Sequence, residues 1–169
     1  MASIEILFLG KEDVDALEIT NQEMLDAIEM GLRAHGAKQV IMPSKDHLVL
    51  DYPERLFNNL KGYVEPINVA GFKVISDFEK NYQHNLPSEL ALITLYRPET
   101  GAPFCIVDGT VITWMRTGAV TALGAKYLAD PKSRVLGHIG ARGTAWYNVE
   151  LLDHIFDFEE IRVTSKRAQ

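Results

Sequence analysis

A strand, a glycine-bearing loop, a helix and a second strand follow one another near the end of the chain, and this unit most constrains the fold. Residues 134–139 and 160–164 read as apolar strands, and residues 144–156 between them read as a helix. Strands joined by a helical crossover pair in parallel. A unit of about 30 residues in this order is typical of the opening of a doubly wound dinucleotide-binding domain. Two parallel strands and one helix are too small to fold alone, so we expect them to belong to a larger α/β protein.

The loop inside this unit reads Gly140, Ala141, Arg142, Gly143, Thr144. In a dinucleotide site such a loop lets the backbone approach the pyrophosphate, which then binds the N–H groups at the helix start. The pattern G-x-G-x-x-A fails at its second glycine, where Arg142 stands, although the arginine charge also suits a phosphate. The sequence therefore leaves two interpretations open: these five residues bind a phosphate, or they form an ordinary strand-to-helix turn.

The end of the second strand bears on which nucleotide such a site would accept. An acidic residue there binds a free ribose 2′-hydroxyl, whereas basic or hydroxyl side chains suit a 2′-phosphate. The segment here is Ser165, Lys166 and Arg167, with no acid. If the site exists, these residues favour NADP(H) over NAD(H). The alternative is a solvated basic loop.

The first 130 residues have a different order of elements, with several predicted strands and two predicted helices. Thr20 and Glu23 have the spacing of a capping box, and apolar residues at helical spacing follow as far as Gly36. A turn over residues 97–101 separates two strand patterns, which predicts a hairpin. The remaining predictions are strands at 4–9, 39–42, 47–50, 63–69 and 71–75, and a helix over 117–128. We therefore predict an α+β domain over residues 1–130 and the opening of a Rossmann-like domain over 131–169.

Three cationic side chains in the first domain are candidates for chemistry. Lys73 lies in an apolar strand pattern, and strand alternation places it on the face opposite Phe72 and Val74. An enclosed lysine can exchange protons near neutral pH, whereas a surface-facing one is ordinary. Arg116 comes just before the predicted helix and suits a carboxylate, although an internal ion pair explains it equally well. Lys45 is a weaker candidate for a second carboxylate contact.

Composition excludes several other classes of protein. The chain has 169 residues, of which 47% are hydrophobic, and 17 basic against 23 acidic residues give a net charge of −6. A mildly acidic chain without a basic run is a poor match for nucleic acid. Cys105 is the single cysteine, so neither an internal disulfide nor a cysteine zinc site is expected, and the histidines show no metal-ligand spacing. With no span-length apolar stretch and no signal sequence, we expect a cytoplasmic protein that binds neither metal nor membrane.

Several segments together carry a family resemblance. They are residues 68–78 around Lys73, 86–88, 96–103, 108–119 and 125–129, followed by the glycine loop. In this order they resemble the ornithine cyclodeaminase/mu-crystallin family. The resemblance implies a homodimer that binds NAD(H) or NADP(H), with a first domain for substrate contacts and dimerisation and a second, Rossmann-like domain. It also implies an amino acid, keto acid or imine as the small-molecule partner.

The resemblance assigns roles to residues at matching positions. Lys73 corresponds to the family's active-site lysine, which contacts the substrate and assists proton transfer. Arg116 corresponds to the arginine that binds the substrate carboxylate, with Thr117 beside the cofactor. Ser88 stands where the family often has a cofactor-contacting threonine, and Lys45 where many members have a second carboxylate-binding arginine. A lysine at that position loses the two-pronged geometry of an arginine.

Three functional hypotheses follow from these observations. The first is an NAD(P)-dependent imine or ketimine reductase or amino-acid dehydrogenase, with conversion of ornithine to proline and ammonia as the alternative within the class. The second is a dimerising or ligand-binding module without turnover. The third is a nonfunctional truncation. Because family members are longer, we expect this chain to be an N-terminal portion that is inactive by itself.

Overall fold

The computed structural model describes residues 3–52 and 54–165 and divides the chain into two compact units. Unit 1 comprises Met1–Glu18 and Gly31–Val111, and unit 2 comprises Ile19–Met30 and Ile112–Gln169. The division falls within α2 (Asn21–Gly36) and within α3 (Thr110–Leu128). The fold class is the predicted α/β, with a mixed sheet in unit 1 and a parallel strand pair in unit 2.

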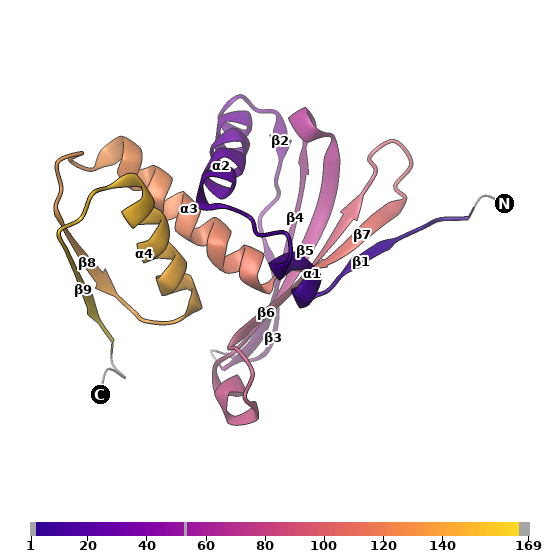
Figure 1. The fold of residues 1–169 in the computed structure, drawn as a ribbon. Helices are drawn as coiled ribbons and strands as arrows, with labels where there is room; N and C mark the ends of the chain where they lie inside the picture. Colours follow the sequence, from indigo (N-terminus) through magenta and orange to yellow (C-terminus); the bar gives the residue numbers. More distant parts are fainter. Residues whose placement is uncertain (1–2, 53, 166–169) are drawn as a thin grey trace. The chain divides into compact units, whose positions relative to one another are not determined.

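A seven-stranded mixed sheet dominates unit 1 (Figure 1). Its order is β1-β7-β6-β5-β4-β2, and β3 also pairs with β4. The parallel pair is β1 with β7, and the other pairs are antiparallel. The strand bounds are β1 (Leu7–Leu9), β2 (Val40–Ile41), β3 (Asp46–Asp51), β4 (Arg55–Val64), β5 (Val69–Phe78), β6 (Glu89–Tyr96) and β7 (Pro103–Asp108).

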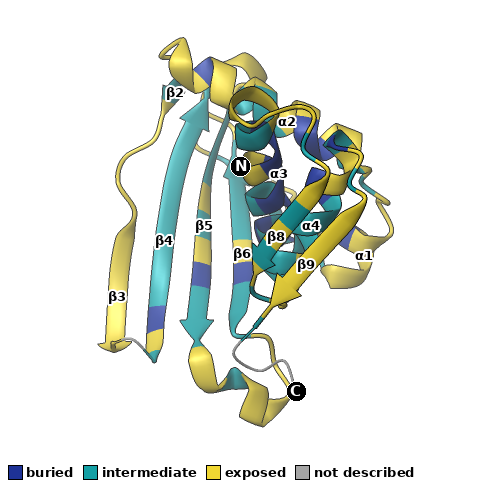
Figure 2. Ribbon diagram, turned by 90° about the vertical axis from the view of Figure 1, so that its left-hand side faces the viewer, coloured by how far each residue is buried: buried dark blue, intermediate teal, exposed yellow. Residues whose placement is uncertain are grey.

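The two faces of this sheet differ in burial. Residues paired across neighbouring strands share a face, so the register places Leu60, Lys73 and Ile93 in one row on what we call the lysine face. This face also carries the buried core residues Leu56, Ile75, Ala91, Cys105 and Val107. The opposite, open face exposes large apolar side chains, namely Phe8, Ile41, Leu48, Phe72, Val74 and Leu92. Figure 2 shows exposed and buried stretches following one another along β5, whereas β3 is exposed throughout.

The hairpin between β4 and β5 corrects one prediction from the sequence. The predicted strand over residues 63–69 is wrong, because β4 ends at Val64 and a 3-10 helix, η1 (Glu65–Ile67), follows. Pro66 has no N–H to donate to a ladder. Asn68 then reverses the chain with a φ of 49°, a conformation that asparagine tolerates better than most residues. The predicted hairpin around residues 97–101 is confirmed, and Gly101 has a φ of 68°.

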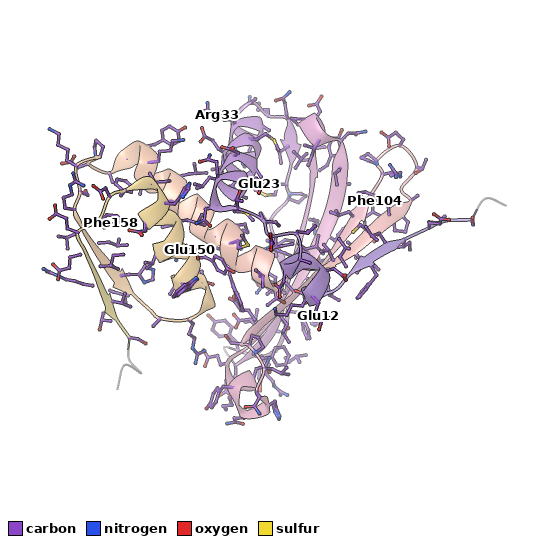
Figure 3. The ribbon with its side chains drawn as sticks, viewed as in Figure 1. Glu12, Glu23, Arg33, Phe104, Glu150 and Phe158 are labelled. Atoms are coloured by element: carbon purple, nitrogen blue, oxygen red, sulfur yellow. The ribbon has the colours of Figure 1, made fainter. Side chains whose placement is uncertain are left out.

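Unit 2 contains the predicted strand–helix–strand. The elements β8 (Val135–Ile139), α4 (Gly143–Ile155) and β9 (Glu160–Thr164) follow in order, and β8 pairs with β9 in parallel. Close helix contact accompanies them, since a Cβ built on Gly118 of α3 would lie 2.5 Å from the carbonyl oxygen of Tyr147 in α4. Figure 3 shows Glu150 on α4 and Phe158 in the segment that leads to β9, where its ring stacks on Phe156 at 5.4 Å.

The prediction for the start of α2 is confirmed, whereas the prediction for the start of α3 is wrong. The capping box is confirmed: Thr20 N donates to Glu23 Oε2 at 2.9 Å, and Glu23 N donates to Thr20 Oγ1 at 3.2 Å. Hydrogen bonds from Thr20 also lower the pKa of Glu23. The predicted start of α3 at residue 117 is wrong, because the helix begins at Thr110, whose N–H donates to Asp108 Oδ1 at 2.8 Å. β-branched residues over 111–113 have low helix propensity, which tertiary packing overrides here.

Two further findings concern the described part of the chain. No helix in it has the length and apolar character needed to cross a membrane. Among the same residues, no group of three or more His, Cys, Asp or Glu side chains is placed to hold a metal ion. Cys105 is a buried free cysteine, as its apolar sequence context predicts.

Candidate active site

A cavity of about 550 Å³ in unit 1 brings two predicted site residues together. Lys45 and Lys73 both line it, although 27 positions separate them in the sequence. The rest of the lining is mostly apolar and includes Val40, Met42, Leu60, Val64 and Ile93. A concave apolar pocket with a few polar groups is the usual form of a small-molecule site.

Lys73 reaches this cavity because of strand alternation. It lies in β5 between Leu60 of β4 and Ile93 of β6. Its side chain is partly buried, whereas its neighbours Phe72 and Val74 are 44% and 43% exposed on the open face. The predicted alternation is therefore confirmed, and the structure places Lys73 on the face that also carries the core of the sheet.

The cavity has a floor of paired glycines and a wall from the segment between β2 and β3. Gly62 and Gly71 are direct partners in the register of β4 and β5. A Cβ on Gly62 would lie 3.3 Å from the carbonyl oxygen of Ile41, so the missing side chain lets β2 approach. The segment then continues to Lys45, which is exposed. Lys61, which also lines the cavity, forms an ion pair with Asp46.

Arg116 and Thr117 lie in unit 2, and their place in the helix differs from the prediction. Both lie in the second turn of α3 rather than at a helix start. Arg116 is partly buried. The hydroxyl of Thr117 donates to the Thr113 carbonyl oxygen at 2.7 Å, so its proton is used within the helix and its lone pairs remain to accept a hydrogen bond.

Ser88 lies in unit 1, just before β6. It is partly buried, and its carbonyl oxygen accepts a hydrogen bond from Phe78 N at 2.8 Å. This backbone hydrogen bond fixes Ser88 at the end of the β5–β6 ladder, just beyond the last paired residues of those strands.

The glycine loop of unit 2 connects β8 to α4 by a sharp turn. Gly140 has a φ of 113°, which strongly favours glycine, and its N–H donates to the Thr164 carbonyl oxygen at 2.8 Å. Arg142 precedes the helix in an extended conformation and is exposed. The Arg142 carbonyl accepts the first helical hydrogen bond, from Trp146 N at 2.9 Å. No side chain among the described residues caps α4.

Close packing within unit 2 requires a glycine at position 143. A Cβ at this position would lie 2.8 Å from the ring of Trp114 in α3, so a side chain would force the helices of unit 2 apart. Ala141 is exposed and Thr144 is partly buried in the first turn of α4. A strand, a positive-φ glycine and an uncapped helix start together fit a pyrophosphate. Ser165 is partly buried, and Lys166 and Arg167 lie outside the described residues.

Sequence reasoning missed the glycine floor and the apolar wall of the cavity. A signal for the floor was present, since Gly62 and Gly71 lie at equal distances from the centre of the turn over residues 65–68. Once that turn is recognised, the hairpin register pairs the two glycines. The wall could not be found in this way, because it depends on how residues 40–45 return over the sheet.

Comparisons with known proteins identify the family that the sequence resembles. The profile of the ornithine cyclodeaminase/mu-crystallin family matches residues 5–169. Alanine dehydrogenase from Archaeoglobus fulgidus is 34% identical over 168 residues, which cover 98% of this chain and 50% of that protein. The chain thus spans about half the length of the curated relatives it matches.

Two solved structures are similar to the fold. One is an archaeal alanine dehydrogenase dimer with bound NAD, with a TM-score of 0.89 and 32% identity over 97% of this chain and 50% of that one. The other is Thermococcus litoralis Delta(1)-pyrroline-2-carboxylate reductase in complex with NADH and L-proline, with a TM-score of 0.92 and 29% identity over 96% and 50% of the two chains. The chain belongs to the ornithine cyclodeaminase/mu-crystallin family.

Proposed function

We propose that this chain forms the substrate-binding part of an NAD(P)H-dependent enzyme that reduces the imine of an α-keto acid to an amino acid. The observation that carries the proposal is the cavity in which Lys45 and Lys73 meet within an otherwise apolar lining. Such a lining gives a small substrate apolar contacts and leaves few groups to orient it. The names of the relatives, a dehydrogenase and an imine-acid reductase, support this class.

Each cation has a distinct role in this proposal. Arg116 binds the substrate carboxylate through two parallel hydrogen bonds, which orient it as well as neutralise it. Lys45 adds a second positive charge but not a second fork, because its ammonium acts as a point charge. Lys73 contacts the substrate beside the reacting carbon and donates or accepts the proton there, as a general acid–base group within hydrogen-bond reach.

The nucleotide is assigned to unit 2. Gly140, Ala141, Arg142, Gly143 and Thr144 would hold the pyrophosphate at the start of α4. Ser88 and Thr117 would contact the rest of the cofactor, and bound NAD(P)H supplies the hydride. Because Ser165, Lys166 and Arg167 include no acid, we favour NADP(H) over NAD(H). Matched titrations of the two reduced nucleotides, followed by the fluorescence of the exposed Trp146, test this preference.

We also assign the open face of the sheet to a second copy of the chain. It presents several large apolar side chains from β1 to β6, among them Phe8 at 65% and Leu92 at 51% exposure. A contiguous apolar surface of this kind marks an interaction site. In a two-fold homodimer this patch would meet the same patch of the second copy.

Because the chain by itself is expected to be inactive, the test uses the full-length enzyme to which we assign it. It follows the reduction of imines, formed in solution from α-keto acids and ammonia, by the consumption of NADPH or NADH. We expect a Lys73→Ala variant to keep less than about a tenth of the activity, since a positioned acid–base group contributes 10²–10⁴-fold. Lys132→Ala, at an exposed lysine outside the cavity, is the control. Activity of Lys73→Ala above that level would refute the role given to Lys73. Release of proline and ammonia from ornithine would instead indicate a cyclodeaminase, and ligand binding without turnover would indicate a non-catalytic module.

A further inference from the structure

The cavity that holds Lys45 and Lys73 also constrains the side chain of the substrate. We infer that the substrate is a monocarboxylic α-imino or α-keto acid whose side chain is apolar and clearly larger than a methyl group. This inference rests on the proposed function, because it takes Lys45 and Lys73 as the groups that meet the carboxylate and the reacting carbon. It goes further by assigning the remainder of the cavity to the side chain.

The first argument is the size of the cavity. Its volume of about 550 Å³ lies within the range of roughly 300–1,000 Å³ that accommodates drug-sized ligands. A substrate with a methyl side chain leaves most of such a space filled by water against apolar walls. A branched, cyclic or aromatic side chain displaces that water, and each buried methylene strengthens binding several-fold.

The second argument is the shape of the floor. Gly62 and Gly71 face each other across β4 and β5 on the lysine face, and neither adds a side chain to the cavity, although Leu95 Cδ2 lies 3.1 Å from the position of a Cβ on Gly71. Lys73 stands two residues beyond Gly71 on the same face, next to Leu60 and Ile93. A substrate whose reacting carbon meets Lys73 therefore has the glycine floor and the apolar side chains beside it within reach.

The third argument is the charge of the lining. Among the described residues that line the cavity, none is Asp or Glu, so this lining offers no carboxylate to neutralise the distal ammonium of a diamino acid. Burial of an unpaired charge is strongly unfavourable. A second carboxylate meets a different obstacle, since Lys61 is paired with Phe72 in the register and therefore belongs to the open face, where it forms an ion pair with Asp46. The lining thus favours an uncharged side chain over both alternatives.

The experiment measures binding to the whole chain, because every lining residue of the cavity belongs to unit 1 and no nucleotide is needed. The probes are pyruvate, 4-methyl-2-oxopentanoate, phenylpyruvate, 2-oxoglutarate and L-ornithine, followed by calorimetry and ligand-observed NMR. We expect 4-methyl-2-oxopentanoate and phenylpyruvate to bind at least about tenfold more tightly than the other three. Equal or tighter binding of pyruvate, 2-oxoglutarate or L-ornithine would overturn the inference.

Two filling variants place the preference in this cavity. Val64→Phe and Met42→Trp add bulk to its lining, and Met42 is 60% exposed, so the second variant remains compatible with folding. Each should weaken the binding of 4-methyl-2-oxopentanoate about tenfold and change the binding of pyruvate by no more than about twofold. Val135→Phe, at a half-exposed valine of β8, is the matched control and should change neither. An unchanged preference in both filling variants would contradict the assignment.

One further variant separates this inference from the proposed function. Lys45→Met removes a carboxylate contact and should weaken all the monocarboxylic keto acids by a similar factor. If it does so while the chain shows no preference for large apolar side chains, the proposed function stands and the inference fails. If no α-keto acid binds to the wild-type chain, the proposed function fails together with the inference.

Discussion

The two faces of β5 have almost the same apolar character and different surroundings. Ile75 on the lysine face is 7% exposed, whereas its neighbour Val74 on the open face is 43% exposed. Lys73 lies on the buried side of the strand, and Phe72, a large aromatic residue, lies on the exposed side. Polarity alone would have assigned these two residues to the opposite faces.

This difference shows that the two faces serve different purposes. The lysine face unites the core of unit 1 with a cavity, so a cation there is held by its surroundings and can be positioned for chemistry. Within a single chain the open face has local ring contacts, such as Phe72 with Tyr96 at 5.5 Å, but several of its large apolar side chains remain exposed. Its composition is explained by a partner surface, which for this chain we propose to be a second copy.

The largest expected effect distinguishes the two faces by stability. Ile75→Ala removes a buried side chain and should lower the free energy of unfolding by about 2–5 kcal/mol. Val74→Ala on the adjacent, half-exposed position should cost about 0.5 kcal/mol or less when the chain is monomeric. Chemical denaturation of both variants at low protein concentration measures the contrast. Similar losses in the two variants would show that the faces are equally buried in solution.

The second effect concerns association. Leu92→Lys places a charge on the open face, where the wild-type side chain is 51% exposed and its ladder partners are Val74 and Asp108. We expect the variant to be monomeric at concentrations where the wild-type chain is dimeric, because the desolvation of an ammonium in an apolar interface costs more than one neighbouring carboxylate returns. Sedimentation measurements over a concentration series report the change.

Two controls sharpen that result. Val120→Lys introduces the same charge at an exposed valine of α3, outside the open face, and should leave association unchanged. The far-ultraviolet circular dichroism of Leu92→Lys should match the wild type, since the residue is not part of the core. Dimers of unchanged affinity in Leu92→Lys would exclude the open face as the interface.

The sequence predicted local features whose cause is local. The capping box at Thr20, the hairpin at residues 97–101 and the alternation at Lys73 each depend on neighbouring residues, and each is confirmed. The strand–helix–strand over β8, α4 and β9 is confirmed for the same reason, because hydrophobic period and glycine placement agree there.

The errors and omissions arose where long-range packing decides. α3 begins at Thr110 despite the β-branched residues that follow, and β4 begins at Arg55, well before the predicted strand. The parallel pairing of β1 with β7 joins segments about 100 residues apart, and no local sequence pattern predicts this pairing. The meeting of Lys45 with Lys73 in one cavity likewise follows from the return of residues 40–45 over the sheet.

The smallest expected effect concerns a charge at the end of the lysine face. Burial, and then the charge of Glu79, raise the pKa of Asp77, which also lies directly opposite Glu89 in the ladder. The folded chain therefore binds this proton more tightly than the unfolded chain does. Stability due to Asp77 is fully present below its ordinary pKa of 3.8 and is lost as the pH rises through the raised value.

Asp77→Asn removes this dependence, since the amide stays neutral. At pH 7 the variant should be more stable than the wild type by up to about 0.5 kcal/mol, and the difference should disappear near pH 3. Thermal unfolding of both proteins across this range measures it, with Asp153→Asn at an exposed aspartate of α4 as the control. A variant that is less stable than the wild type at pH 7 would show that the Asp77 carboxylate is held by favourable contacts. The lysine face would then tolerate buried negative charge, which would also weaken the case against dicarboxylic substrates.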